Sequence, residues 1–431
     1  MAPESNPVRA VAREFAASVG EGDPADAADL LSETGTEEAV ESFPEEFQQG
    51  ELDAEAALRE YHRGLYGQYG DFEGVETVAA EADCAIVELG FEDGAQTLEL
   101  GVEDGSVADL CFPTSYAPPL YADCNAFAER DVTVDADDAT LNGNLAVPEG
   151  DGPFPGVVLV HGAGIHDPDG TVGATKILRD FAWGLATDGV AVLRYEKRLR
   201  DHDVPDEAFT LDNVVVDDAV AAVDELAAAD AVAEDALFVA GHSQGGMAAP
   251  GVAERHGNVA GVVNLDGPAD PVFDPEDVDI LKYEFEPDGD LDEEQAAQLE
   301  VQEEAARRIA AGDYEVDETL WSRPGAWHDS VADYDPREAL RRADCPVFAA
   351  KPYRVDEDRQ PELTEWARQG YEAWRDADLP SGSRTERYEG LGHYFQEGYA
   401  PSSMLSLYFG GNAAEFVVHD VAEWVETIAD A

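Results

Sequence analysis

Short, almost continuous apolar runs in the second part of the chain constrain its fold more than any other feature. The runs are PGVVLVHG (155–162), GVAVLRYEK (189–197), ALFVAGHS (236–243), VAGVVNLDG (259–267) and CPVFAAK (345–351). A strand that is apolar at successive positions is buried on both faces, as in a parallel sheet covered by helices. Helical stretches such as LRDFAWGLATD and VVVDDAVAAVDELAAAD separate the runs. The pattern therefore predicts a doubly wound, mostly parallel α/β sheet.

The segments around this sheet have different patterns. Residues 1–125 show helical periodicity over 7–19, 23–32 and 53–70, followed by short alternating stretches with turns between them. They predict a small α+β domain, to which no chemistry can be assigned and which is expected to bind a ligand or to dimerise. Residues 126–431 then form the sheet domain, and an acidic, mostly helical insertion at about 268–344 is expected to cap it.

The charge of the chain is extreme. Its 431 residues include 26 lysines and arginines against 95 aspartates and glutamates, so the formal net charge is −69. Such self-repulsion destabilises a compact state in dilute buffer, whereas molar salt screens it over about 3 Å. We therefore expect adaptation to high salt. A nucleic-acid partner is excluded, because no basic stripe is present to meet phosphates.

The sequence gives little evidence of export. Its first residues, MAPESNPVRAVAREF, lack a basic start with an apolar stretch, and no apolar run is long enough to span a membrane. A cytoplasmic protein is expected. The four cysteines, Cys84, Cys111, Cys124 and Cys345, lack C-x-x-C spacing and are expected to be buried, with one disulfide among the first three left open.

A nucleophile is predicted where the third apolar run ends. The run continues as Gly241-His242-Ser243-Gln244-Gly245, a G-x-S-x-G between a strand and a helix of small residues. A sharp strand-to-helix turn exposes the serine hydroxyl at the carboxyl edge of the sheet and leaves no room for side chains at the glycines. Ser243 is therefore the candidate nucleophile, and the alternative is a glycine-rich turn with an idle serine.

The first apolar run ends in a second candidate element. His161-Gly162-Ala163-Gly164 can direct a backbone N–H toward the same point. Attack on an acyl carbonyl creates an oxyanion that requires two such donors, which we assign to the N–H groups of Ala163 and Gln244. His161 is expected to be structural. His166 with Asp167 and Asp169 suggests a metal site, but nothing else in the chain completes one, so no metal is expected.

The candidate general base is His393. It lies in YEGLGHYFQEG (388–398), a glycine-flanked loop after the last expected strand, and it completes the chain order serine, acid, histidine.

These motifs resemble the α/β-hydrolase superfamily. VVLVHGAG, VAVLRYEKR, VAGHSQGGMAAP and LGHYFQ carry the resemblance, which covers about 130–431 and is nearest to the esterase, dienelactone hydrolase and serine aminopeptidase branch. Some members have a small α+β domain before the hydrolase domain, as residues 1–125 suggest. The resemblance implies acyl-transfer hydrolysis by Ser243 and His393 without a metal or organic cofactor.

The sequence departs from that family at the acid. The usual acid follows the next-to-last strand in a G-x-x-D context, but KPYRVDEDRQP has Pro352 and Val355 at the two positions. Asp356 and Asp358 remain as candidates there. Asp266 lies 23 residues after Ser243 at the tip of the preceding strand, where some members of the superfamily carry the acid. Because the triad is defined by geometry, Asp266 is the leading candidate and Asp356 the first alternative.

The sequence thus predicts a serine hydrolase that cleaves a carboxylic ester through an acyl-enzyme. Its substrate is expected to be a small acyl compound. A serine aminopeptidase or other amidase and a thioesterase remain alternatives, as does a catalytically inactive binding protein. The acyl chain, the leaving group and the oligomeric state cannot be predicted.

Overall fold

The computed structural model describes residues 6–48 and 52–431 and divides into two compact units. The first unit is Met1–Ala117 together with Val172–Thr175 and Glu397–Gly411. The second is Pro118–Thr171, Lys176–Gln396 and Asn412–Ala431. The sequence suggests a domain boundary between residues 125 and 126. The first unit also takes in two later segments of the chain, so this boundary stays a prediction.

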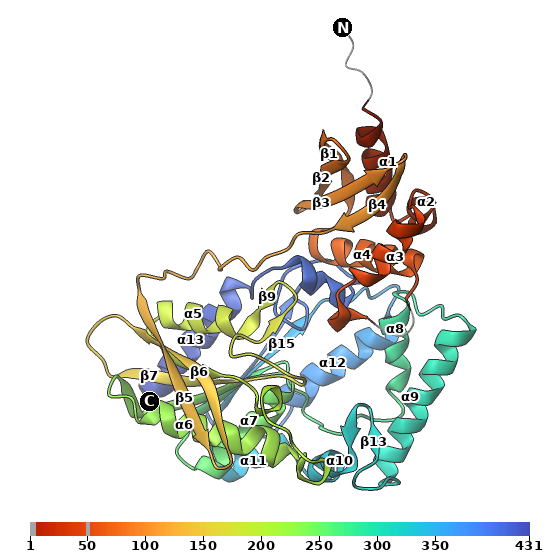
Figure 1. Ribbon diagram of the computed structural model, residues 1–431. Coiled ribbons are helices and arrows are strands. Elements are labelled where there is room, and N and C mark those ends of the chain that lie inside the picture. The colour runs from red at the N-terminus through yellow and green to blue at the C-terminus, as the bar shows by residue number, and fades with distance from the viewer. Residues whose placement is uncertain (1–5, 49–51) are drawn as a thin grey trace. The chain divides into compact units, whose positions relative to one another are not determined.

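The first unit combines helices with an antiparallel sheet. Its helices are α1 (Pro7–Glu21), α2 (Pro24–Ala28), α3 (Glu33–Glu41), η1 (Glu45–Phe47), α4 (Ala54–Tyr69) and η6 (Met404–Phe409). Its strands β1 (Phe72–Glu81), β2 (Cys84–Phe91), β3 (Gly94–Glu103) and β4 (Ser106–Cys111) pair in chain order. Leu405 and Phe409 of η6 complete the core between these helices and strands. The small α+β arrangement expected for the beginning of the chain is thus present (Figure 1).

One helix of this unit is shorter than predicted. The sequence suggests a helix over residues 23–32, but α2 ends at Ala28. The N–H of Val107 donates to the carbonyl of Leu30 at 2.9 Å, and the N–H of Ser32 donates to the carbonyl of Val107 at 2.8 Å. This bridge to β4 competes with helix continuation and draws the chain into an extended form.

The second unit contains an eight-stranded sheet, which confirms the predicted fold class. Its order is β16-β15-β12-β11-β7-β10-β6-β5. The strands are β5 (Phe127–Ala136), β6 (Ala139–Pro148), β7 (Phe154–Val160), β10 (Ala191–Tyr195), β11 (Val232–His242), β12 (Gly261–Leu265), β15 (Val347–Tyr353) and β16 (Arg384–Glu389). All neighbours from β10 to β16 are parallel, whereas β5, β6 and β10 pair antiparallel.

Helices cover both faces of this sheet. Val157 and Leu159 of β7 belong to one apolar cluster, and the alternate Val158 and Val160 belong to another. The first cluster includes residues of α5 (Ile177–Thr187) and α13 (Glu415–Ala429), and the second includes residues of α6 (Asp217–Ala227) and α7 (Gln244–His256). Figure 1 shows α5 and α13 on the face opposite α6 and α7. Because adjacent side chains of a strand point to opposite faces, both faces of β7 are buried.

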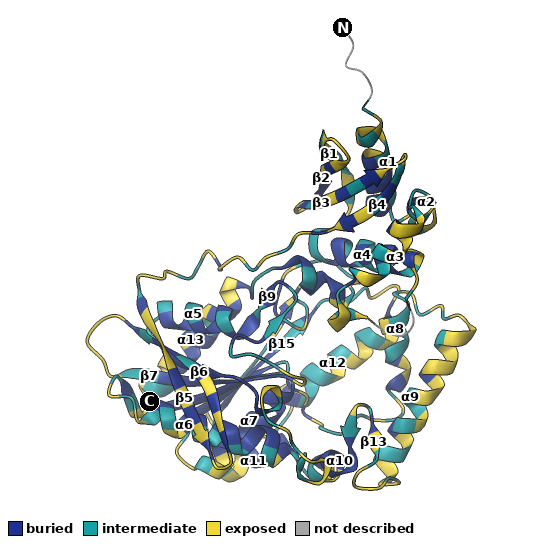
Figure 2. Cartoon of the chain, in the orientation of Figure 1, coloured by how far each residue is buried: buried dark blue, intermediate teal, exposed yellow. Residues whose placement is uncertain are grey.

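The acidic segment after β12 is mostly helical. It contains η5 (Val278–Leu281), α8 (Lys282–Phe285), α9 (Glu293–Ala311), α10 (Gly325–Ala332) and α11 (Pro336–Ala343), with a short hairpin of β13 (Thr319–Leu320) and β14 (Arg323–Pro324). Of α9 only Leu299 and Ala306 are buried, and Figure 2 shows most of this helix as exposed or intermediate. α12 (Pro361–Arg375) follows β15, and its Trp374 is fully buried.

Other expectations had mixed outcomes. All four cysteines are free thiols, and only Cys345 is buried, so the expectation that they are buried is wrong for Cys84, Cys111 and Cys124. Each of these three lies at an exposed strand end or in a surface turn. Within the described ranges, no helix combines the length and the apolarity that a bilayer span requires.

Candidate active site

Ser243 lies in a sharp turn between the end of β11 and the start of α7. Its φ of 53° and ψ of −117° belong to a region that non-glycine residues rarely adopt, which costs on the order of 1–3 kcal/mol. The N–H of Ser243 donates to the carbonyl of Leu265 on the neighbouring strand at 2.8 Å. A Cβ at Gly241 would overlap the backbone of Gly245, and a Cβ at Gly245 would overlap the carbonyl of Val160. The two glycines are thus required by the close approach of the turn.

Two backbone N–H groups are available beside this serine. Within the described part of the chain, neither the N–H of Ala163 nor that of Gln244 is bonded to an acceptor. A Cβ at Gly162 would lie 3.4 Å from Cβ of Ser243, so the loop after β7 passes directly beside the turn. Gln244 begins α7, where the helix dipole also favours negative charge. These groups have the chemical character that an oxyanion site requires.

A buried lysine joins the two elements. Nζ of Lys197 donates to the carbonyl of Gly162 at 2.6 Å and to Oε1 of Gln244 at 2.7 Å. Burial, together with the charge of Arg323, lowers the pKa of Lys197 to about 7. The sequence analysis did not identify Lys197, which lies two residues after the end of β10.

Asp266 and His393 are in direct contact. Asp266 follows β12 with a φ of 57°, and its Oδ2 lies 2.5 Å from Nδ1 of His393. Gly267 immediately behind it donates its N–H to Oδ1 of Asn264 at 2.6 Å. A Cβ at Gly267 would overlap the backbone nitrogen of Met247, so only glycine fits between this turn and α7. The packing of β12 against α7 thus fixes the position of the carboxylate.

Lys351 is a second partner of this carboxylate. It lies on β15, with 11% of its side chain exposed, and its Nζ forms an ion pair with Oδ1 of Asp266. Burial by itself would raise the pKa of Asp266, but the charge of Lys351 and the hydrogen bond from His393 outweigh it and lower the pKa to about 2. The carboxylate is therefore ionised at neutral pH. Lys351 ends the apolar run CPVFAAK, and the sequence analysis gave it no role.

The alternative acids have other partners. Oδ1 of Asp356 accepts hydrogen bonds from the backbone N–H groups of Asp358 and Arg359 at 3.1 and 3.0 Å. Its other oxygen lies 3.6 Å from Arg359, so Asp356 organises the turn before α12. Asp358 is exposed. Within the described residues, His393 forms no hydrogen bond or ion pair with either side chain, and its Nδ1 is engaged by Asp266.

His242 holds the loop that carries His393. Its Nε2 donates to the backbone carbonyl of His393 at 3.0 Å. Burial and the neighbouring His393 lower the pKa of His242 to about 3, so the ring is neutral at physiological pH. His242, the residue before Ser243, thus acts as a neutral hydrogen-bond donor to the loop of His393, a role that the sequence analysis missed.

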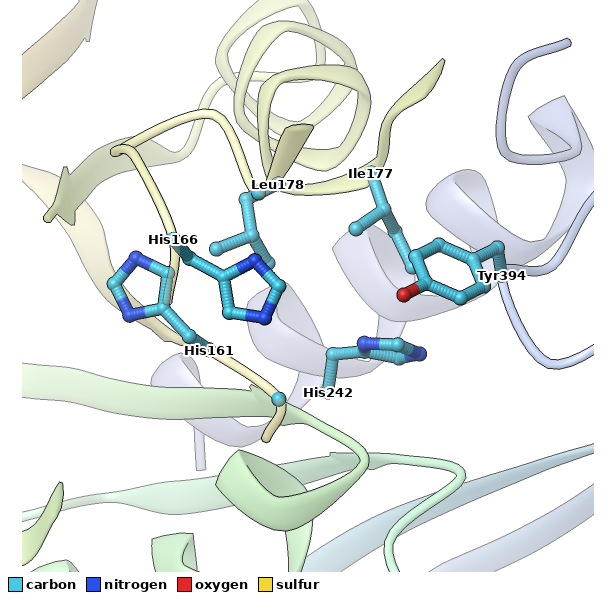
Figure 3. Close-up of a pocket in the computed structure, with 8 residues that line it drawn as sticks. His161, His166, Ile177, Leu178, His242 and Tyr394 are labelled. Carbon is cyan, nitrogen blue, oxygen red and sulfur yellow. The ribbon is translucent and has the colours of Figure 1, made fainter. Parts of the chain in front are cut away.

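A small pocket is lined in part by His242, the residue before Ser243 (Figure 3). Its empty volume, open solvent included, is about 200 Å³. His161, His166, His242, Tyr394, Ile177 and Leu178 line it together with Gly162 and Gly170. The rings of His161 and His166 stack at 5.9 Å, and Nε2 of His166 lies 2.7 Å from the carbonyl of Ala163. Burial lowers the pKa of both imidazoles, so neutral rings support the loop of Ala163.

The acids near His166 are engaged in other ways. Asp169 pairs with Lys176, Arg179 and Arg194, and Asp167 accepts the N–H of Thr171 at 3.0 Å. In the part of the chain that the structure describes, no group of three histidine, cysteine or acidic side chains is placed to hold a metal ion.

Comparisons with known proteins agree on one family. The model of the alpha/beta hydrolase family matches residues 157–401. Esterase EstD of Thermotoga maritima is 30% identical over 382 residues, which cover 86% of this chain and 87% of that protein. The part of this chain that matches is longer than residues 126–431 alone, so the similarity extends into the first 125 residues.

Solved structures give more distant matches. Est1E from Butyrivibrio proteoclasticus matches with a TM-score of 0.43 and 17% identity, covering 70% of this chain and 99% of that one. A hyperthermophilic esterase from the archaeon Pyrobaculum calidifontis also has a TM-score of 0.43 and 17% identity, with 70% and 87% covered. The family model and the 30% identical relative carry the assignment.

Proposed function

This chain belongs to the alpha/beta hydrolase family, and we propose from that premise that it hydrolyses carboxylic esters with Ser243 as the nucleophile. The observation that carries the proposal is the 2.5 Å contact between Asp266 Oδ2 and His393 Nδ1. It joins an ionised acid and a histidine in the unit that also contains the strained serine. The name of the 30% identical relative, an esterase, supports the choice of an ester over other acyl bonds.

The proposed mechanism follows from the roles of these groups. With Nδ1–H of His393 donated to Asp266, the second ring nitrogen, Nε2, is the one that can accept the proton of the Ser243 hydroxyl. The serine oxygen attacks the ester carbonyl, and the N–H groups of Ala163 and Gln244 stabilise the oxyanion that forms. The imidazolium then gives its proton to the leaving alcohol, which leaves an acyl-enzyme.

Water completes the cycle by the same steps. His393 takes a proton from a water molecule that attacks the acyl-enzyme. The second oxyanion then collapses, the bond from the acyl carbon to the serine oxygen breaks, and the imidazolium returns its proton to that oxygen, which releases the carboxylic acid and restores the serine. The negative charge of Asp266 stabilises the imidazolium in both halves of the reaction. The pKa of about 2 keeps that carboxylate charged throughout the neutral range.

A substrate panel tests the proposal. Chromogenic esters, thioesters and aminoacyl amides are assayed with the wild-type protein and with Ser243→Ala in molar KCl. We expect ester hydrolysis by the wild type and its loss in the variant, together with labelling of Ser243 by a fluorophosphonate. Folded wild-type protein that neither hydrolyses any ester nor takes up the label contradicts the proposal.

We also propose that the protein requires high salt. The net charge of −69 supports this, because a surface of that charge repels itself strongly unless mobile cations screen it.

A further inference from the structure

Lys197 holds the loop after β7 at two points. Its backbone N–H donates to the carbonyl of His166 at 3.0 Å, and its Nζ donates to the carbonyl of Gly162 at 2.6 Å. The same ammonium donates to Oε1 of Gln244, the first residue of α7, at 2.7 Å. One side chain is thus bonded both to the loop and to the residue that are proposed to supply the two oxyanion donors.

The bond to Gly162 acts directly on one of these donors. The carbonyl of Gly162 and the N–H of Ala163 belong to the same trans peptide group. That group is planar, so a cation that holds the oxygen also holds the N–H, which points the opposite way. The ammonium draws electron density toward the oxygen, which makes the N–H a stronger donor, as in hydrogen-bond chains whose members polarise one another. Lys197 therefore both orients and strengthens the N–H of Ala163.

A purely structural role does not explain the charge at this position. Only 3% of Lys197 is exposed, and within the described ranges no carboxylate forms an ion pair with it. Asp218 acts on it through its charge but is bonded to Arg198, and burial together with the charge of Arg323 outweighs Asp218 and lowers the pKa of Lys197 to about 7. An ammonium buried against neutral acceptors is costly. Negative charge that develops nearby during attack on an ester offsets this cost.

We propose that Lys197 is a positioning residue that stabilises the oxyanion through the peptide group of Gly162 and Ala163 and through Gln244. The inference rests on the proposed function and adds a residue that acts when negative charge forms on the substrate. Lys197 itself does not touch the substrate in this scheme, because its ammonium is bonded to the opposite end of that peptide group. Its removal should therefore weaken the binding of a transition-state analogue and spare the binding of a neutral substrate analogue.

Two ketones measure that difference. In butyl trifluoromethyl ketone the Ser243 oxygen adds to the carbonyl carbon while the serine proton passes to His393, which gives a tetrahedral oxyanion like that of ester attack. Butyl methyl ketone has the same chain and stays a neutral carbonyl. Both are assayed as competitive inhibitors of 4-nitrophenyl butyrate hydrolysis in molar KCl. Lys197→Met should raise the Ki of the trifluoromethyl ketone about 10–100-fold and that of the methyl ketone less than about twofold.

The matched control is Lys282→Met. It removes an ammonium that is ion-paired with Asp279 at the start of α8, so both affinities should stay at their wild-type values. Urea unfolding shows that each variant is folded. An equal loss of both affinities in Lys197→Met indicates a lysine that only supports the structure and overturns the inference. A trifluoromethyl ketone affinity that this substitution leaves unchanged overturns it as well.

The pH dependence of the wild-type protein is a second measurement. Lys197 carries its charge below its pKa of about 7 and loses it above. The charged and titratable groups of other elements that interact with it are Arg323, Asp218, His161 and His166. Burial keeps both imidazoles neutral. We expect kcat for a neutral ester to fall above pH 7 in the wild type, and in Lys197→Met we expect a low kcat that rises with pH to a plateau as His393 loses its proton. A fall above pH 7 that persists in this variant would refute the role of Lys197.

The outcomes distinguish the role of Lys197 from the proposed function. Ester hydrolysis by the wild type, with a preference for the trifluoromethyl ketone that Lys197→Met retains, refutes the role of Lys197 alone. Folded wild-type protein that hydrolyses no ester, takes up no fluorophosphonate at Ser243 and shows no preference for the trifluoromethyl ketone refutes both.

Discussion

Replacing Asp266 by asparagine separates the proposed catalytic role of this residue from its structural role. The amide keeps the size of the side chain but removes its charge, so His393 loses its carboxylate and Lys351 loses its ion-pair partner. We expect kcat for a neutral ester to fall by about 10⁴-fold, as loss of the orienting acid does in serine proteases. We also expect the free energy of unfolding to fall.

The size of the stability loss follows from the pKa of Asp266. That pKa is about 2, against an ordinary value of 3.8, and one pKa unit corresponds to about 1.4 kcal/mol. The fold therefore favours the charged carboxylate by about 2.5 kcal/mol. Because the pKa is lowered in the folded state, this stabilisation is complete above the ordinary value and is lost as the pH falls toward 2. Measurements near neutral pH contain all of it.

A second substitution distinguishes the two effects. In Asp266→Asn the ammonium of Lys351 stays buried without a partner, so adding Lys351→Met should recover most of the lost stability. The same change cannot restore an acid to His393, and kcat should stay low. Urea unfolding and 4-nitrophenyl butyrate hydrolysis in molar KCl measure the two quantities, with Asp356→Asn as the control that keeps near-normal kcat. Near-normal turnover in Asp266→Asn together with collapse in Asp356→Asn refutes the assignment of the acid.

Three further perturbations test the surroundings of the site. Lys197→Met removes the ammonium that joins the loop of Ala163 to Gln244, so kcat for neutral esters should fall about 10–100-fold. Thermal unfolding should show an intact fold. Unchanged kcat contradicts a role for this lysine. Gly267→Ala forces a Cβ into the backbone of α7 and should lower the free energy of unfolding in urea by about 1–3 kcal/mol. Gly370→Ala, which has open space around it in α12, should leave that free energy unchanged or raise it. Equal effects of the two substitutions contradict the packing argument. The unfolding midpoint should rise steeply between dilute buffer and molar KCl because the net charge is −69, and a midpoint independent of KCl refutes the proposed salt requirement.

The sheet domain was largely predictable because its signals are local. Nearly continuous apolar runs identify the five parallel strands β7, β10, β11, β12 and β15, since burial on both faces favours apolar residues at most positions. The turn at Ser243 was predictable from its local glycine pattern, although the structure shows that Gly241 is required by the nearby Gly245 and Gly245 by the distant Val160. The end of α2 was not, because it is set by a bridge from Leu30 to the distant Val107.

The proposed acid was less predictable than the sheet but more predictable than the end of α2. Chain order and the absence of an aspartate after β15 favoured Asp266, yet only geometry brings it to His393, which is 127 residues away in the sequence. The structure also gives a physical reason for the unusual position. The strand that normally precedes the acid ends here near Lys351, whose ammonium faces the tip of β12 and lowers the pKa of the carboxylate there. A cation on one strand thus stabilises the acid on its neighbour.

Lys197 and Lys351 show what sequence reasoning lacks in a chain of this composition. Among 95 acids and 26 cations, a carboxylate is the expected surface residue and carries little information, whereas a cation that lacks local acids is rare and informative. Lys197 and Lys351 are held away from solvent by contacts with segments far along the chain, so their partners are visible only after folding. Both act on groups of the proposed oxyanion site and triad. In this strongly acidic chain, the buried lysines therefore indicate the candidate site better than the acids do.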